Sequence, residues 1–336
     1  MLKNSLSGKY FHQNLPFPTT YFQKYSIFGL LILAIVFFNF GSVSAQDTTR
    51  SPIIVNGRLA RFANFKSEFV IPRNVDVWLP TNYSHKKKYE VLYMQDGQML
   101  FDSSTTWNKQ AWDVDNIILK LGSENKLRDF ILVAVWNTKL RHSEYIPEKP
   151  FLSLNSTEKQ RVTDAGKKIA NRVLEEGKPI SDLYLKFLVT ELKPFIDRTF
   201  STKKGLKHTF ISGSSKGGLI SLYAICEYPK IFGAAACLST DWPVIFTNEN
   251  TPMPKALQNY IAQKAPNPRN HKLYFDFGTK TLDSLYEKHQ LKVDSILIGK
   301  GFKNKNFKSL KFEGKSHTER DWRGRFDIPL LFLLGK

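Results

Sequence analysis

The feature that most constrains the fold is a G-x-S-x-G pentapeptide, Gly213–Gly217, which is followed by a further glycine, Gly218. A strand-like run, His208–Ser212, precedes it, and a helix-like run, Leu219–Cys226, follows it. The order strand, G-x-S-x-G, helix is typical of a nucleophile elbow, a turn that holds the hydroxyl of its central serine clear of the sheet. Glycines allow the strand and the helix to approach each other closely. The pattern therefore predicts a reactive Ser215; a Gly/Ser-rich turn is the alternative.

The N-terminal segment has the layout of a secretory signal. Three lysines lead into an apolar run, Ile27–Phe40, and small residues follow up to Ala45. This succession predicts a signal peptide over residues 1–45 that is cleaved after Ala45, and therefore an exported protein, periplasmic or secreted. An uncleaved anchor is the alternative, although the apolar run is short for a membrane span of about 20 residues. We expect no stable membrane insertion once the signal is removed.

The chain is strongly basic. Removal of the signal takes away three of its 49 basic residues and none of its 30 acidic ones, so residues 46–336 carry a net charge of +16. A solvated basic surface is the simplest interpretation, and an acidic substrate or a polyanionic envelope surface is the alternative. Export and the lack of a nucleic-acid reading motif exclude nucleic acid as an expected partner. The sequence contains no indication of the oligomeric state.

Strand-like and helix-like segments alternate from residue 89 onward. The strand-like segments are 89–94, 130–135, 208–212, 232–238, 272–277 and 307–312. The helix-like segments are 112–121, 182–196, 216–228, 254–263 and 281–299, and Pro194 is expected to end or kink the second of these. Two leading strands are expected at roughly 61–70 and 74–79. This alternation predicts an α/β fold, with a doubly wound, mostly parallel sheet and helices on both faces.

One long polar stretch, 138–181, breaks the alternation. A stretch of this length without strand or helix patterning can lie over a functional site as a cap. A surface insertion with no catalytic role is the other interpretation. In either case residues 46–336 are expected to form a single domain, because their number suits one large α/β core.

His317 is the candidate general base. A serine hydroxyl is a poor nucleophile that needs a base within hydrogen-bond reach, and the base needs an orienting acid. After a nucleophile elbow, the acid and then the histidine follow in chain order. Of the seven histidines, only His317 lies in a loop just past a strand downstream of the elbow. A solvated loop histidine is the alternative.

Asp283 is the preferred candidate acid, and Asp241 is the alternative. Asp283 follows the strand that ends at Gly278, and Asp241 follows the preceding strand. For Asp283 a helix N-cap is the other interpretation. Asp276 lies within a strand, where it is expected to tie neighbouring backbone together.

Two backbone N–H groups are candidates for an oxyanion hole, which stabilises the charge of a tetrahedral intermediate. One belongs to Lys216, the residue after the serine, and the other to Gln98, in the loop after strand 89–94. The alternative for the second position is that Asp96–Gly97 is merely a turn.

Ligands bind at the C-terminal edge of the strands in open α/β sheets. Three tryptophans that follow strand ends or the oxyanion loop are therefore expected to line the substrate pocket: Trp112, Trp136 and Trp242. Ordinary core packing is the alternative for each.

The chain resembles the putative esterase family of the α/β-hydrolase superfamily, the group that includes esterase D-like, feruloyl and enterochelin esterases. The resemblance covers roughly residues 70–335 and rests on Val91–Gln98, Gly213–Gly218, Phe275–Thr279 with Asp283, and His317. It implies an α/β-hydrolase fold with Ser215 as nucleophile, Asp283 as acid and His317 as base. The chain departs from the family pattern at Gln95, where a histidine is common, and at Lys216, where methionine or leucine is more usual.

The resemblance implies a serine esterase that hydrolyses a carboxylic ester through an acyl-enzyme. Together with the signal-like N-terminus, it predicts an exported enzyme, and a small-molecule or carbohydrate-linked ester is the expected substrate. An acyltransferase with the same triad is one alternative, and a non-catalytic binding protein on a hydrolase scaffold is another. The intact set of serine, aspartate and histidine argues against the binding protein. No His/Cys/Asp cluster has the spacing of metal ligands, so neither a metal nor a cofactor is expected.

Overall fold

A computed structural model describes residues 50–167, 174, 177–245 and 251–336. The predicted signal peptide, residues 1–45, lies outside the described residues, as do 168–173, 175 and 176 of the predicted cap. No helix within the described ranges is both long enough and apolar enough to span a membrane.

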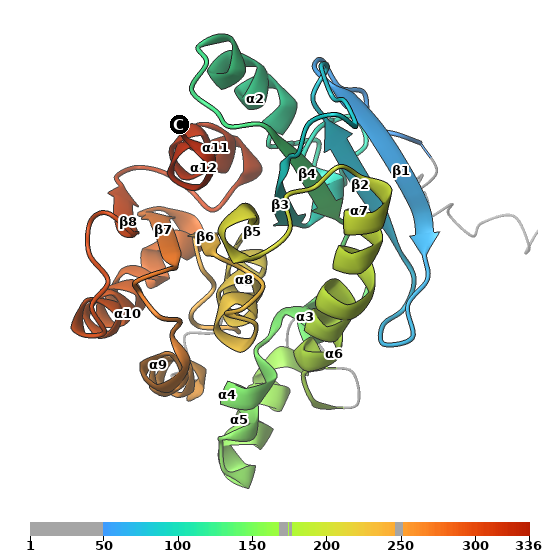
Figure 1. The fold of residues 1–336 in the computed structure, drawn as a ribbon. Coiled ribbons are helices and arrows are strands. Elements are labelled where there is room, and N and C mark those ends of the chain that lie inside the picture. The colour runs from blue at the N-terminus through green and yellow to red at the C-terminus, as the bar shows by residue number, and fades with distance from the viewer. Residues whose placement is uncertain (1–49, 168–173, 175–176, 246–250) are drawn as a thin grey trace, which may run out of the picture. The chain divides into compact units, whose positions relative to one another are not determined.

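An eight-stranded sheet runs through the domain in the order β1-β2-β4-β3-β5-β6-β7-β8 (Figure 1). The strands are β1 (Arg58–Phe65), β2 (Arg73–Leu79), β3 (Glu90–Gln95), β4 (Phe130–Val135), β5 (Thr209–Ser214), β6 (Ala234–Leu238), β7 (Lys272–Gly278) and β8 (Phe307–Phe312). β2 pairs antiparallel with β1 and with β4, and the pairs from β4 to β8 are parallel. Strands β3 to β6 are buried along their whole length, which explains the continuous apolar sequences of β4 and β6.

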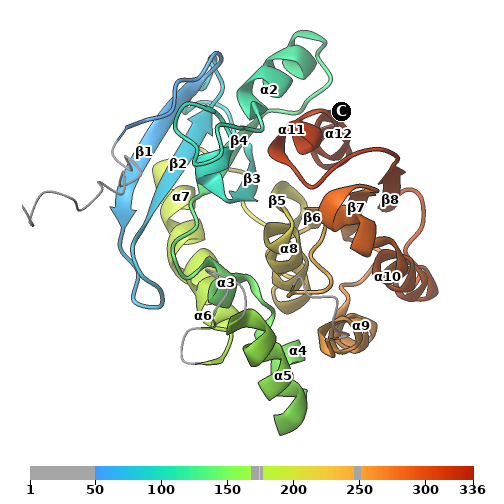
Figure 2. The same cartoon turned by 180° about the vertical axis from the view of Figure 1, so that it is seen from behind.

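Helices cover both faces of this sheet, as Figures 1 and 2 show. One face carries α2 (Val114–Ser123), α11 (Glu319–Arg323) and α12 (Asp327–Leu334), and the other carries α7 (Lys193–Thr199), α8 (Lys216–Glu227), α9 (Met253–Lys264) and α10 (Glu287–Gly299). Neighbouring strand residues point to opposite faces, so Phe210 and Ile211 of β5 belong to different apolar clusters. This architecture confirms the predicted α/β fold and is of the α/β-hydrolase type.

The helical path around residues 181–199 is longer than predicted. α6 (Ser181–Lys186) continues into a π-helical segment, η3 (Phe187–Leu192), and then into α7. Pro194 therefore does not end the helix, because it lies in the first turn of α7, where a missing N–H is tolerated. The change of hydrogen-bond register in the π-helical segment accommodates the proline.

The first strand ends earlier than predicted. β1 covers Arg58–Phe65 instead of 61–70. The hydroxyl of Ser67 accepts the N–H groups of Phe69 and Val70, at 3.0 and 3.2 Å, and this local turn takes the chain out of the sheet.

The described part of 138–181 forms three short helices: α3 (Arg141–Tyr145), α4 (Glu148–Leu152) and α5 (Ser156–Lys167). Tyr145, Ile146 and Phe151 are buried in the apolar cluster that also contains the inner side chains of α8. α3 and α4 therefore pack into the domain. The remaining short turns are η1 (Gly97–Met99), η4 (Leu206–His208) and η5 (Thr281–Leu285).

Candidate active site

Ser215 occupies the sharp turn between β5 and α8. Its backbone has φ 57° and ψ −125°, a conformation that residues other than glycine rarely adopt. The neighbouring strand holds this turn in place, because the N–H of Ser215 donates to the carbonyl of Leu238 at 2.9 Å. The carbonyl of Ser215 in turn accepts the N–H of Asp241 at 3.2 Å. Backbone hydrogen bonds from its N–H and to its carbonyl thus keep the serine in its strained conformation.

The flanking glycines are needed for the close approach of β5 and α8. A Cβ atom at Gly213 would lie 2.6 Å from the carbonyl carbon of Gly217, and one at Gly217 would lie 3.0 Å from Oδ2 of Asp96. The strand and the helix therefore meet backbone to backbone at this point, as the motif predicts.

We expect Gly213→Ala to lower the free energy of unfolding by about 1–3 kcal/mol or more, because the added methyl group meets backbone that also carries Ser215. Gly122→Ala is the matched control. It lies in α2, where an added Cβ meets nothing within 4 Å, and alanine should raise the free energy of unfolding by about 0.5–1 kcal/mol. Denaturant unfolding of both variants measures the contrast. Equal stability of the two would contradict this account of the elbow.

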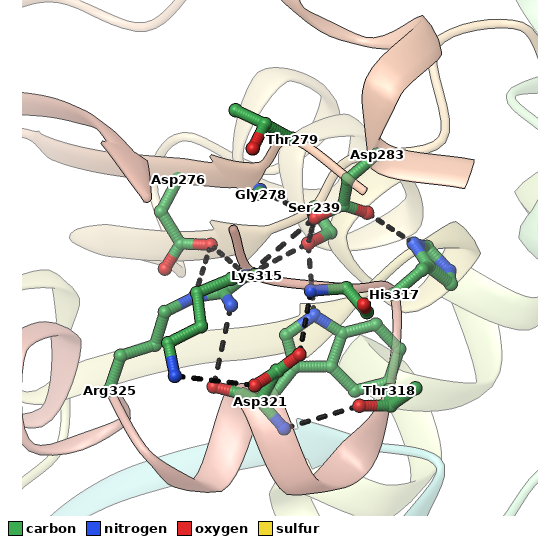
Figure 3. Close-up of polar contacts among 12 residues, drawn as sticks. Ser239, Asp276, Gly278, Thr279, Asp283, Lys315, His317, Thr318, Asp321 and Arg325 are labelled. Atoms are coloured by element: carbon green, nitrogen blue, oxygen red, sulfur yellow. Dashed lines mark hydrogen bonds and ion pairs between the residues drawn. The ribbon is translucent and has the colours of Figure 1, made fainter. Parts of the chain in front are cut away.

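His317 and Asp283 lie together although they come from different loops (Figure 3). Nδ1 of His317 lies 2.6 Å from Oδ1 of Asp283. Asp283 is buried in η5, after β7, and His317 lies in the loop between β8 and α11. The N–H of His317 donates to the hydroxyl of Thr281 at 2.8 Å, which ties the two loops to each other.

The second oxygen of the Asp283 carboxylate is held just as closely. Oδ2 accepts the hydroxyl of Ser239 and the N–H of Gly278, both at 2.6 Å. These bonds leave Oδ1 directed at His317, as Figure 3 shows. The carboxylate is therefore oriented from both sides.

A buried network behind Asp283 holds Ser239. The hydroxyl of Ser239 accepts Nε1 of Trp322 at 2.9 Å and Nη2 of Arg325 at 3.0 Å. Arg325 also donates to Oδ1 of Asp276 at 2.9 Å. The sequence predicts that Asp276 ties neighbouring backbone together, but its carboxylate pairs with Arg325 instead, because the C-terminal segment brings a guanidinium against it (Figure 3). Sequence reasoning missed Ser239 and Arg325, since neither lies in a recognisable motif.

The surroundings of Asp283 favour its ionised form. Burial by itself raises the pKa of this carboxyl, but hydrogen bonds from His317, Ser239 and Gly278 and the charge of His317 outweigh it. The pKa of Asp283 is therefore lowered from its ordinary value. A buried carboxylate with these partners is suited to orient an imidazole.

The lowered pKa predicts a dependence of stability on pH. A folded-state pKa below the unfolded value of about 3.9 means that ionised Asp283 stabilises the native state fully above about pH 5 and loses this contribution as the pH falls through the folded-state pKa. We expect the difference in free energy of unfolding between the native protein and Asp283→Asn to shrink between pH 7 and about pH 3. Denaturant unfolding at both pH values measures it. A difference that does not change with pH would be inconsistent with this role of the carboxylate.

Asp241, the alternative acid, pairs with Lys216. Nζ of Lys216 donates to Oδ2 of Asp241 and, at 2.6 Å, to the carbonyl oxygen of Val244. Both side chains of this ion pair are almost fully buried beside the elbow. Asp241 therefore contacts the residue after the serine, whereas Asp283 contacts the histidine. The geometry favours Asp283 as the partner of His317.

Ser215 and His317 line one cleft of about 860 Å³. Lys216 and Gln98, the two predicted oxyanion donors, line the same cleft. Lys216 is the first residue of α8, so its N–H points out of the N-terminal end of that helix. Across the described ranges, no group of three or more His, Cys, Asp or Glu side chains is arranged to hold a metal ion.

The three tryptophans that were predicted to line the pocket differ in their position relative to the cleft. Trp112 is among the described residues that line the cleft, whereas Trp136 and Trp242 lie outside this set. The indoles of these two residues are buried elsewhere. Nε1 of Trp136 donates to Asp76 at 2.8 Å, and Nε1 of Trp242 donates to Gln290 at 3.0 Å.

Other residues that sequence reasoning missed also line the cleft. Trp322 lies beside His317, with ring centroids 4.8 Å apart, and Trp107 lies in the loop before α2 with 74% of its surface exposed. The beginning of the predicted cap contributes Thr138, Lys139, Arg141 and His142. No pattern in the sequence indicates these contacts, since each depends on how a loop folds back over the sheet edge.

Comparisons with known sequences show which family the chain matches. The profile of the family described as "Putative esterase" matches residues 67–327. Two proteins of Bacillus subtilis (strain 168), YbbA and YjcH, are each 26% identical to the chain, over 168 and 181 residues. The matches cover 50% and 53% of this chain but only 56% and 60% of those proteins. The chain thus spans somewhat more than half the length of the curated relatives it matches.

Several solved structures share the fold. A ferulic acid esterase superposes with a TM-score of 0.58 at 16% identity, covering 82% of this chain and 97% of that one. An IroE-like serine hydrolase from Shewanella oneidensis gives 0.58 at 18% identity, with 80% and 78% covered. The enterobactin hydrolase IroE, in complex with DFP, gives 0.54 at 19% identity, with 83% and 96% covered. At these identities the likeness shows the common fold.

Proposed function

We propose that the chain, which belongs to the putative esterase family, hydrolyses carboxylic esters through an acyl-enzyme formed on Ser215. The observation that carries this proposal is the 2.6 Å contact between His317 and Asp283 in a cleft lined by Ser215. In this scheme Asp283 accepts a hydrogen bond from the Nδ1–H of His317, and Nε2 is the nitrogen that takes the proton of the serine.

The reaction follows from these positions. Oγ of Ser215 attacks the ester carbonyl carbon while its proton passes to Nε2 of His317. The carbonyl oxygen becomes an oxyanion, which the N–H groups of Lys216 and Gln98 stabilise. The intermediate then collapses, the bond to the alcohol oxygen breaks, and His317 returns the proton to the leaving alcohol. Water activated by His317 attacks the acyl-enzyme and restores Ser215.

A fluorophosphonate probe tests this scheme on the purified protein. We expect covalent labelling at Ser215, identified by peptide mass spectrometry, and a loss of ester hydrolysis in proportion to labelling. Release of one equivalent of 4-nitrophenol in a burst would report the acyl-enzyme itself. Product analysis with added alcohols measures how far acyl transfer competes with hydrolysis. Intact hydrolysis without any labelling would refute the acyl-enzyme on Ser215.

We propose a small-molecule or carbohydrate-linked ester as the substrate. Two of the structural relatives are named for ferulic acid and for enterobactin, both of which carry aromatic rings. The exposed indole of Trp107 at the cleft provides a flat apolar surface for a ring. A panel of esters with graded straight-chain and aryl acyl groups identifies the preferred class by kcat/KM.

We further propose that the protein is exported and that residues 1–45 are its signal peptide. The succession of lysines, apolar residues and small residues supports this assignment. N-terminal sequencing of the protein recovered outside the cytoplasm should begin at Gln46. Full-length chain retained in the membrane fraction would show an uncleaved anchor instead.

A further inference from the structure

Arg141 binds the loop that carries Gln98, one of the two proposed oxyanion donors. Nε and Nη2 of Arg141 donate to Oδ1 and Oδ2 of Asp96, each at 2.7 Å. Nδ2 of Asn137 donates to Oδ1 of Asp96 at 2.6 Å. A bidentate arginine–carboxylate pair fixes orientation as well as charge. The Asp96 carboxylate is therefore held by three donors, all of which come from residues just after β4.

The backbone of this loop has a conformation that few residue types adopt. Asp96 has φ 57° and ψ 45°, the left-handed region, which aspartate enters more readily than most residues because its short side chain can form local hydrogen bonds. The next residue, Gly97, has no room for a side chain, since a Cβ there would lie 2.6 Å from the carbonyl carbon of Ala134. Gln98 follows, and its side-chain Oε1 accepts the N–H of Asn137 at 3.1 Å. The position of the Gln98 backbone thus depends on contacts from the segment that contains Arg141.

Asp96 also connects this loop to the nucleophile elbow. Its Oδ2 lies 3.0 Å from the position of a Cβ at Gly217, so the carboxylate is packed against the first turn of α8. Arg141 and Asp96 line the same cleft as Ser215 and Gln98. Burial lowers the pKa of Arg141, but the charge and hydrogen bonds of Asp96 outweigh this effect and raise it. The guanidinium consequently stays charged.

We infer that Arg141 is a positioning residue for ester hydrolysis: by holding Asp96, it places the N–H of Gln98 where the oxyanion forms. This inference rests on the proposed function. It also gives part of the stretch 138–181 a role in turnover, because Arg141 begins α3 within that stretch. The contribution of Arg141 should appear in kcat, because the N–H of Gln98 is needed most strongly when negative charge develops on the substrate oxygen.

The test compares kcat and KM of Arg141→Ala with those of the native protein. Loss of one oxyanion donor lowers kcat about 10²–10³-fold, and we expect a loss of about 10²-fold with KM changed less than about threefold. Arg141→Lys keeps a positive charge but loses the bidentate contact with Asp96. Its kcat should therefore fall between that of the native protein and that of Arg141→Ala. Millimolar guanidinium should restore part of the activity of Arg141→Ala and none of that of Arg141→Lys.

Arg323→Ala is the matched control. Arg323 pairs with Asp113, which has φ 48° and ψ 45° and precedes α2 much as Asp96 precedes η1. Both residues lie outside the described lining of the cleft. Arg323→Ala should therefore keep kcat within about twofold, although it too frees an aspartate in the left-handed conformation.

The outcomes separate the inference from the proposed function. If the native protein is not labelled at Ser215 by a fluorophosphonate, the proposed function fails, whatever Arg141 does. If the native protein is labelled and Arg141→Ala keeps its kcat, or raises KM alone, the positioning role is overturned. If Arg141→Ala does not fold, Asp96→Asn replaces it, because asparagine tolerates the left-handed conformation. Folded Asp96→Asn with an unchanged kcat would overturn the inference equally.

Discussion

Ser215→Ala should lower kcat for ester hydrolysis about 10⁴-fold or more and abolish labelling by a fluorophosphonate. The alanine removes the only atom that can form the acyl-enzyme in the proposed reaction. The residual rate comes from substrate binding and the oxyanion donors alone. His317→Ala should cost a similar factor, because the hydroxyl without its base is a poor nucleophile.

The double variant distinguishes a joint mechanism from two separate contributions. Residues that act as a unit have grossly non-additive effects, so Ser215→Ala/His317→Ala should lose little more than either single variant. Steady-state kinetics on one 4-nitrophenyl ester measures all three. Additive losses in log kcat would mean that Ser215 and His317 do not act in the same step.

Asp283→Asn should lower kcat on the order of 10³–10⁴-fold, less than Ser215→Ala. The Asp283 carboxylate lies 2.6 Å from Nδ1 of His317, and an amide in its place can present a donor there and favour the wrong tautomer. KM should change little, since the carboxylate is buried behind the histidine. Steady-state kinetics on the same ester, with the melting temperature of each variant, gives the comparison.

Asp241→Asn is the matched control for this prediction. Asp241 is buried as completely as Asp283, but its partner is Lys216. The substitution leaves that buried lysine without a counter-charge, so it should lower stability while costing far less kcat than Asp283→Asn. A greater loss of kcat in Asp241→Asn would assign the acid to Asp241.

The parallel part of the sheet could be predicted from the sequence because its strands are short and separated by helical patterning. Strands β4 and β8 have the predicted bounds, 130–135 and 307–312. Strand β1 begins and ends earlier than the sequence predicts, because the turn at Ser67 is made by a single hydroxyl that no periodicity reveals. The sequence does not indicate that the helix continues through Pro194, because a π-helical segment has no signature comparable to that of a proline.

For the candidate site, the sequence indicates residues that act through local motifs and misses those that act through tertiary contacts. Ser215 and Gln98 lie in turns with their own patterns, and chain order then selects His317. Arg325 reaches Ser239 across 86 residues, and no rule of spacing anticipates such a bond. The tryptophans show a similar limit. Their positions in the sequence indicate the edge of the sheet at which they lie. The direction of each side chain then determines whether it lines the cleft, as that of Trp112 does, or is buried, as that of Trp242 is.

The backbone conformation of Ser215 that the proposed activity requires lowers the stability of the fold. Its φ of 57° and ψ of −125° suit glycine, and a residue with a side chain there costs about 1–3 kcal/mol. That amount is a sizeable fraction of the net stability of a typical domain, about 5–15 kcal/mol. A lineage that no longer needed the reaction could therefore gain stability through one change, from serine to glycine, at this position.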